Sequence, residues 1–170
     1  MNDFWQEIAD ADDDYREAEA SHAMIERVEK RLGFTLPASY IALMQSRNGG
    51  YPINTCHSSP NATSWARDHV AIAAFKGIGD QKLWSLCGDH GSLHWINEWD
   101  YPAIGIYFGD CPSYGHDMMC LDYRACGPVG EPCVVHVDQD RDYTITYLAD
   151  SFAAFVRGLK PASYFDNEAE

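Results

Sequence analysis

The sequence has 170 residues, of which 46% are hydrophobic, and its formal net charge is -14. This length and hydrophobic share predict one ordinary domain with a core of its own. The acidic balance excludes binding of nucleic acid through phosphates, which requires lysine and arginine. No stretch approaches the roughly 18 apolar residues of a membrane-spanning helix, and the first residues lack the pattern of a secretory signal. We therefore expect a cytoplasmic protein that binds neither nucleic acid nor membrane.

The negative charge is concentrated in two parts of the chain. Residues 1–20 carry eight acidic residues and one arginine, a net charge of -7. Residues 98–142 carry nine acidic residues and two arginines, again a net charge of -7. Such patches can steer a basic partner toward a surface, although a solvated face that keeps the protein soluble has the same composition.

The cysteines and histidines do not form a recognisable metal motif. The six cysteines include no CxxC pair, and without an export signal we expect reduced thiols rather than disulfides. His90 and His94 are four residues apart and could share a helix face, but they lack a third ligand at a matching spacing. We predict neither a metal site nor a cofactor.

Two short helices are predicted after the acidic leader. Ser21 is a typical N-cap, apolar residues then recur at helical spacing over residues 22–32, and Gly33 is typical of a helix end. Pro37 favours the start of a second helix, which the segment Asn48-Gly49-Gly50 closes.

The middle of the chain is less regular. Residues 51–66 are rich in Asn, Ser, Pro and Thr and indicate an exposed loop, whereas residues 69–76 indicate a strand. Four tryptophans follow within 35 residues, and they could build core or serve as interface anchors. These tryptophans are Trp65, Trp84, Trp95 and Trp99.

A series of strands is predicted next. Residues 103–109 alternate as in a strand, and residues 117–123 and 133–138 are expected to pair as a hairpin around the turn at 127–132. A last helix is expected to start near Asp150 or Ser151, either of which is a plausible N-cap. Helices, then strands with short turns, then a helix predict an α+β domain with a mainly antiparallel sheet.

Residues 115–132, which span the first strand and the turn of this hairpin, hold the densest group of chemically capable side chains. His116, Asp117, Asp122 and Tyr123 could belong to an acid/base site, because a carboxylate can orient a histidine. The alternative is that these side chains bond turn and strand-end groups and that the glycines supply positive φ angles. Because Ser113 and the nearby cysteines lack the context of an activated nucleophile, we predict no catalytic residues.

Several of these segments resemble one known family. The segment IERVEKRLGFTLPASYIALMQSRNGG, residues 25–50, is similar to the signature of the SUKH superfamily (the SMI/KNR-type domain), and residues 134–159 resemble its last strands and final helix. The resemblance covers about residues 21–159. The positions that carry it between and within these segments include Asn48, Gly49, Gly50, Gly115, His116, Asp117, Asp122, Tyr123, Gly130, Glu131 and Pro132.

The resemblance implies a single SUKH-like α+β domain over residues 21–160, with an acidic leader at 1–20 and an acidic tail at 161–170. It also implies an immunity protein that binds a polymorphic toxin, commonly a nuclease or deaminase, and that is not an enzyme. The alternatives are an intracellular regulatory scaffold, like the yeast cell-wall-assembly regulators of the superfamily, and a His/Asp-dependent hydrolase.

The acidity of residues 98–142 suggests which surface would bind such a partner. A nucleic-acid-acting toxin must be basic, so acidic residues flanking aromatic anchors are the expected binding face. If residues 138–142 are extended, their alternate carboxylates lie on one side. The oligomeric state is left open. The candidate partner-binding residues are Glu98, Trp99, Asp100, Tyr101, Asp138, Asp140 and Asp142.

Overall fold

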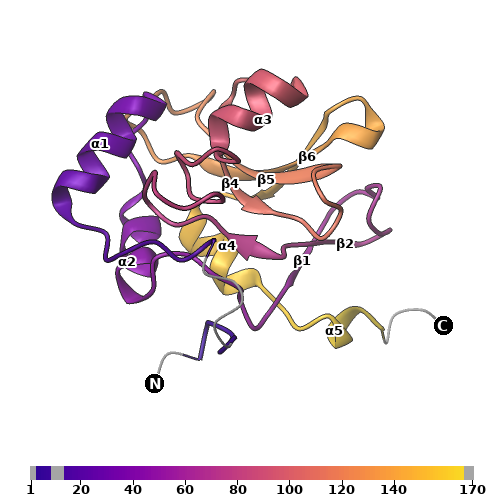
Figure 1. The fold of residues 1–170 in the computed structure, drawn as a ribbon. Helices are drawn as coiled ribbons and strands as arrows, with labels where there is room; N and C mark the ends of the chain where they lie inside the picture. The colour runs from indigo at the N-terminus through magenta and orange to yellow at the C-terminus, as the bar shows by residue number, and fades with distance from the viewer. Residues whose placement is uncertain (1–2, 9–13, 167–170) are drawn as a thin grey trace.

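A computed structural model of the chain describes residues 3–8 and 14–166, which form an α+β domain (Figure 1). The helices are α1 (His22–Leu32), α2 (Ala38–Ser46), α3 (Ser92–Trp99), α4 (Phe152–Gly158) and α5 (Ser163–Asp166). The strands are β1 (Cys56–Ser58), β2 (His69–Ala71), β3 (Ala74–Phe75), β4 (Gly105–Asp110), β5 (Asp117–Asp122), β6 (Cys133–Asp138) and β7 (Thr144–Ala149).

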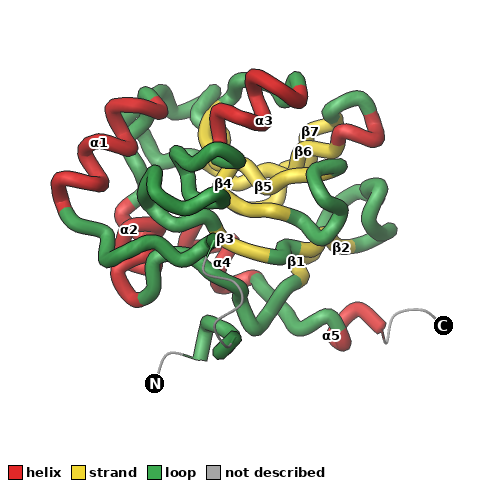
Figure 2. The backbone as a smooth tube through the Cα atoms, in the orientation of Figure 1, coloured by secondary structure: helices red, strands yellow, loops and turns green. Residues whose placement is uncertain are grey.

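The centre of the fold is a five-stranded sheet in the order β3-β4-β5-β6-β7, with each strand antiparallel to its neighbours. Strands β1 and β2 form a separate two-stranded sheet beside it (Figure 2). The predicted hairpin is confirmed, because β5 pairs with β6 from Asp117 opposite Asp138 to Asp122 opposite Cys133. The predicted fold class is confirmed as well.

Both faces of the sheet are covered, which explains why its central strands are buried along their whole length. On β5, Met119 and Leu121 pack into the core that contains α4, whereas Met118 and Cys120 face the side of α3. This division follows from the alternation of side chains along a strand. Figure 1 shows α3 and α4 on opposite sides of the sheet.

Local sequence signals set the ends of two predicted helices. The Ser21 side chain accepts a hydrogen bond from the Met24 amide at 3.2 Å, and Gly33 ends α1 with φ of 82°. The Ser151 side chain caps α4 in the same way through the Ala154 amide. The predicted bounds of the first helix are confirmed at His22–Leu32.

The predictions for residues 51–76 were partly wrong. The loop at 51–66 contains β1, and the single strand expected at 69–76 is divided into β2 and β3, which belong to different sheets. The chain changes partners between them: the Ile72 amide donates to Thr55, on the β1 side, and the Ala73 amide donates to Asp110 at the end of β4. The backbone therefore leaves one sheet and enters the next within two residues.

The described part of the leader packs against the domain. Trp5 is 4% exposed and lies in the main core, with its ring 5.9 Å from the ring of Phe75. Most of the Asp12-Asp13-Asp14 run and the last four residues of the tail lie outside the described residues. Across the part of the chain that the structure describes, no helix combines the length and the apolar character needed to cross a bilayer.

Candidate functional site

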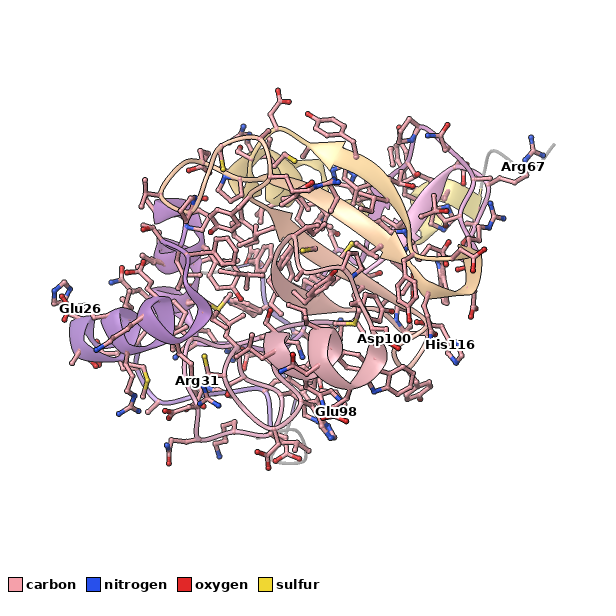
Figure 3. All side chains as sticks on the ribbon, turned by 90° about the horizontal axis from the view of Figure 1, so that it is seen from above. Glu26, Arg31, Arg67, Glu98, Asp100 and His116 are labelled. Atoms are coloured by element: carbon pink, nitrogen blue, oxygen red, sulfur yellow. The ribbon has the colours of Figure 1, made fainter. Side chains whose placement is uncertain are left out.

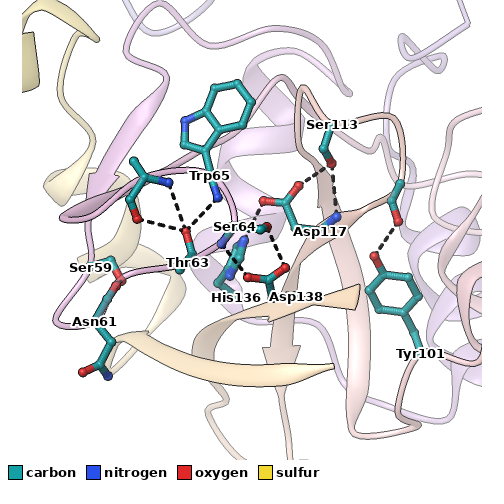
Figure 4. A network of polar contacts seen from close by, with 12 residues as sticks. Ser59, Asn61, Thr63, Ser64, Trp65, Tyr101, Ser113, Asp117, His136 and Asp138 are labelled. Atoms are coloured by element: carbon teal, nitrogen blue, oxygen red, sulfur yellow. Dashed lines mark hydrogen bonds and ion pairs between the residues drawn. The ribbon is translucent and has the colours of Figure 1, made fainter. Parts of the chain in front are cut away.

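The hairpin places a polar network inside the sheet. Asp117, at the start of β5, and His136, on β6, lie on adjacent strands, and His136 Nε2 is 2.6 Å from Asp117 Oδ2. The hydroxyl of Ser113 donates to the other oxygen of Asp117 and accepts from the Asp117 amide (Figure 4). The exposed fractions of Asp117 and His136 are 1% and 0%, so this pair is enclosed by the fold.

Cys111 completes a cluster with these two residues. One potential metal-binding atom from each of Cys111, Asp117 and His136 lies within 4.8 Å of the others. Burial, together with the nearby carboxylate of Asp117, raises the pKa of the Cys111 thiol well above its ordinary value. A nucleophile requires the thiolate, so the surroundings of Cys111 oppose that role. The arrangement fits an internal polar network of the hairpin.

His116 and Asp122 lie near the two ends of β5. His116 is exposed, and its Nδ1 is 2.9 Å from Asp140 Oδ1 in the connection between β6 and β7. Asp122 binds the side chain of Arg124 with both oxygens and accepts from the Arg124 amide. The structure therefore does not bring His116, Asp117 and Asp122 together.

The acidic surface, as we name it here, consists of four exposed carboxylates from two connections. Glu98 and Asp100 lie at the end of α3, and Asp140 and Asp142 lie in the β6–β7 connection. The two connections are joined, because the hydroxyl of Tyr143 donates to the Trp99 carbonyl. Figure 3 shows Asp100 and His116 on the same side of the molecule, far from Glu26.

Two residues predicted for this surface are buried, which corrects the expected binding face. Tyr101 is 2% exposed, and its hydroxyl donates to the Gly115 carbonyl at 2.6 Å. Asp138 is 1% exposed and accepts hydrogen bonds from both the amide and the hydroxyl of Ser64 (Figure 4). Trp99 is half-buried at the edge.

The condition for alternation at residues 138–142, an extended segment, is not met. Residues Gln139–Arg141 form a 3-10 turn, and Asp142 and Tyr143 follow with φ of 54° and 57°. The side chains of Asp138, Asp140 and Asp142 therefore do not share one side of an extended segment. The run of Asp residues between two strands was the signal for this turn, because Asp favours turns and tolerates positive φ.

Beside the acidic surface lies a pocket of about 500 Å³, which the sequence analysis did not find. We name it the aromatic pocket. Its walls include Tyr15, Tyr51, Trp84 and Trp95, and Asp110 adds a carboxylate. The Tyr15 and Trp84 rings stack at 5.6 Å and 12°, and Tyr51 meets Tyr15 edge-on at 5.4 Å. The volume lies within the usual range of small-ligand pockets, roughly 300–1,000 Å³.

A buried lysine supports the aromatic pocket. Lys76 is 0% exposed, and its Nζ donates to Asp110 Oδ2 at 2.8 Å and to the His90 carbonyl at 2.9 Å. The same Nζ lies 5.2–6.0 Å from the ring centroids of Tyr15, Trp84 and Trp95. Burial lowers the pKa of Lys76, and the carboxylate of Asp110 opposes that shift. Lysine at the end of the apolar segment 69–76 was the only local signal for this arrangement.

The Asn48-Gly49-Gly50 segment joins the leader to the pocket region. The Asn48 amide group donates to the carbonyls of Ala18 and Ile78, and its oxygen accepts from the Ile78 amide at 2.7 Å. At Gly49, φ is 99° and an added Cβ would lie 2.1 Å from the Tyr15 carbonyl oxygen. This site admits no side chain.

The remaining motif residues of the hairpin occupy structural positions. Gly115 has φ of 99°, and an added Cβ would lie 2.7 Å from the Trp95 ring. The Tyr123 hydroxyl donates to the Thr35 carbonyl between α1 and α2 at 2.7 Å. Within the turn, Gly130 packs against Cys126, Pro132 is buried and Glu131 is exposed.

A family comparison agrees with these features. The SUKH_6 family model, described as SMI1-KNR4 cell-wall, matches residues 22–156. This match spans α1 and α2, the whole five-stranded sheet and most of α4. A search of curated proteins found no match. Because the family model covers well over half of the sequence, the chain belongs to the SMI1-KNR4 (SUKH) family.

Proposed function

We propose that the chain is an immunity protein, which binds a cognate toxin and neutralises it by contact. The observation that carries this proposal is the acidic surface on a member of a family known for immunity proteins and for SMI1/KNR4-like proteins. Four exposed carboxylates lie at the end of α3 and in the β6–β7 connection, two segments that the Tyr143–Trp99 hydrogen bond joins, on a chain with a net charge of -14. A surface of this charge complements a basic protein.

The proposed partner is a nuclease or another toxin that acts on nucleic acid. Such a toxin needs positive charge to hold phosphates, and an acidic protein can cover that charge. Neutralisation by contact requires no chemistry from the immunity protein. The enclosure of the His136–Asp117 pair and the raised pKa of Cys111 support a non-enzymatic role.

A second candidate is a regulatory scaffold, which the cell-wall description of the matched family favours. The identity of the neighbouring gene distinguishes an immunity protein from a regulatory scaffold. An immunity protein is expected beside a gene for a large protein with a small toxic C-terminal domain. Coexpression of that domain with this chain should restore growth, whereas a scaffold would leave the cells poisoned.

Charge variants test the surface directly. The variant E98Q/D100N/D140N/D142N neutralises the acidic surface and changes the net charge from -14 to -14 + 4 = -10. Asparagine suits positions 100 and 142, where φ is 58° and 54°, because it tolerates positive φ. The control D3N/E26Q/E131Q/D166N neutralises four exposed acids elsewhere, with the same change in net charge.

Association with the toxin domain is then followed by stopped-flow fluorescence at low and high salt. The acidic-surface variant should associate about tenfold or more slowly at low salt, and it should lose much of its salt dependence, because such charges act mainly on the association rate. The control should associate at nearly the wild-type rate. A rate that is indifferent to salt and to both variants would overturn the role of the acidic surface.

A further inference from the structure

The aromatic pocket adjoins the acidic surface through a short loop. Gly115 lies against Trp95 of the pocket, and its missing Cβ would also come within 3.8 Å of Trp99 at the edge of the acidic surface. The next residue, His116, is paired with Asp140 of that surface. The aromatic pocket and the acidic surface are therefore neighbours on the molecule.

The walls of the pocket favour a cation. The faces of Tyr and Trp rings attract positive charge, and the internal ammonium of Lys76 already lies within 6.0 Å of three of these rings. Lys76 is paired with Asp110, so the two charges compensate each other. Asp14 also lines the pocket, and with the strongly negative chain it disfavours an anionic ligand.

One polar atom of the lining lacks a partner. Lys76 binds Oδ2 of Asp110, while Oδ1 is buried and has no hydrogen-bond partner among the described residues. Asp110 as a whole is 7% exposed. Oδ1 is therefore enclosed by the protein, and Asp110 offers the pocket its negative charge rather than an accessible acceptor atom.

Arginine meets these conditions better than lysine. Its guanidinium is planar and weakly hydrated, so it can stack on a ring face while its edge donates several hydrogen bonds. The pocket offers the rings of Tyr15 and Trp84 for the face of the guanidinium, and the carboxylates of Asp14 and Asp110 lie in the same lining. A lysine ammonium is compact and strongly hydrated, and it has no planar face to stack on a ring.

We propose that the aromatic pocket receives an arginine side chain of the bound partner, which stacks on the pocket rings and lies beside the carboxylates of Asp14 and Asp110. This inference rests on the proposed function, because the arginine belongs to the toxin. It adds a defined anchor to a surface that is otherwise recognised by charge. The acidic surface would govern how fast the partner arrives, and the pocket how long it stays.

The first test uses the isolated protein and two small probes. Nα-acetyl-arginine amide should shift the indole N–H signals of Trp84 and Trp95 in ¹H–¹⁵N spectra, and the shifts should saturate. Nα-acetyl-citrulline amide has nearly the same shape without the charge. It should bind at least about tenfold more weakly, because it lacks the cation–π attraction. Equal binding of both probes, or no saturable shift with either, would overturn the proposal.

Pocket variants provide the controls. Trp84→Leu removes one ring of the stack and should weaken binding of the arginine probe at least about tenfold. Trp65→Leu removes a tryptophan that is 43% exposed and outside the pocket lining, and it should bind as the wild type does. Tyr114→Asn replaces a lining ring that is 93% exposed, at φ of 59°, so it weakens binding without disturbing the core.

The second test uses the complex with the toxin domain. Trp84→Leu should speed dissociation about tenfold or more and leave the association rate nearly unchanged, the opposite of the acidic-surface variant. Replacing the toxin's interfacial arginines one at a time should identify one whose loss has no further effect in the Trp84→Leu background. Unchanged dissociation would overturn the pocket proposal and leave the proposed function intact. A chain that binds the arginine probe but no toxin would instead overturn the proposed function.

Discussion

The imidazole of His136 and the carboxylate of Asp117 lie 2.6 Å apart inside the sheet, with exposed fractions of 0% and 1%. Each residue belongs to a different strand of the central hairpin, so their contact fixes the pairing of β5 with β6. A polar pair at this depth is costly to break, because the remaining partner is left without a hydrogen bond or a counter-charge.

The first prediction concerns this pair. Asp117→Ala should lower the free energy of unfolding by about 3–5 kcal/mol, the usual loss when one partner of a buried pair is removed. The matched control is Asp140→Ala, which breaks the exposed contact with His116 and should cost less than about 1 kcal/mol. Urea unfolding followed by tryptophan fluorescence measures both, and equal losses would contradict the structural role of the buried pair.

The second prediction concerns Asn48, whose side chain makes three hydrogen bonds to Ala18 and Ile78. Asn48→Ala should lower the free energy of unfolding by about 3 kcal/mol or more, because several buried backbone groups lose their partner at once. Asn61→Ala, at an exposed position, should change it by less than about 0.5 kcal/mol. Thermal unfolding measures both variants. If Asn48→Ala and Asn61→Ala lower the stability by similarly small amounts, the Asn48 contacts contribute little.

The elements that the sequence predicts correctly are those defined by neighbours in the chain. Ser21 and Gly33 bound α1 through contacts within three or four residues, so their identity alone marks the helix ends. The β5–β6 hairpin is likewise marked by alternation and by the turn residues between its strands. Interactions between residues that are close in the chain determine these features, so the sequence alone is enough to predict them.

The features that the sequence does not reveal depend on distant partners. Asp138 looks like a surface residue because it is charged, yet its partner Ser64 is 74 residues away. The aromatic pocket is lined by residues from separate segments, and their spacing in the sequence does not indicate that they lie together. These residues are Tyr15, Tyr51, Trp84 and Trp95. The acidic surface was predicted in part, since Glu98, Asp100, Asp140 and Asp142 are exposed as expected.

The third prediction concerns pH. Burial raises the pKa of the Cys87 thiol from 9.0 to about 11. In the unfolded chain this thiol ionises near its ordinary value, while the folded protein keeps the proton, so its contribution to stability is complete below pH 9 and is lost between pH 9 and 11. The stability difference between wild type and Cys87→Ala should therefore fall over that range by up to about 2–3 kcal/mol.

The measurement is urea unfolding at several alkaline pH values with a reductant present. Ser85→Ala is the matched control, because it alters a buried group of the same loop that does not ionise in this range. Its stability difference from wild type should stay constant with pH. A constant difference for Cys87→Ala as well would contradict the raised pKa.

The last prediction concerns the loop that Asp138 holds. Both oxygens of Asp138 accept hydrogen bonds from Ser64, and Arg141 donates to the Ala62 carbonyl, so the β6–β7 connection is bonded to residues 59–68. Asparagine keeps one acceptor oxygen, so Asp138→Asn removes one hydrogen bond to a charged acceptor, worth about 1.5–3 kcal/mol, and this loop should open about tenfold to a hundredfold more often. Hydrogen exchange should then be faster by that factor for the hydrogen-bonded amides of residues 63–66 in Asp138→Asn. The exposed neighbour Asp140→Asn should leave the same amides protected, and equal protection in both variants would show that the Asp138–Ser64 contact does not hold the loop.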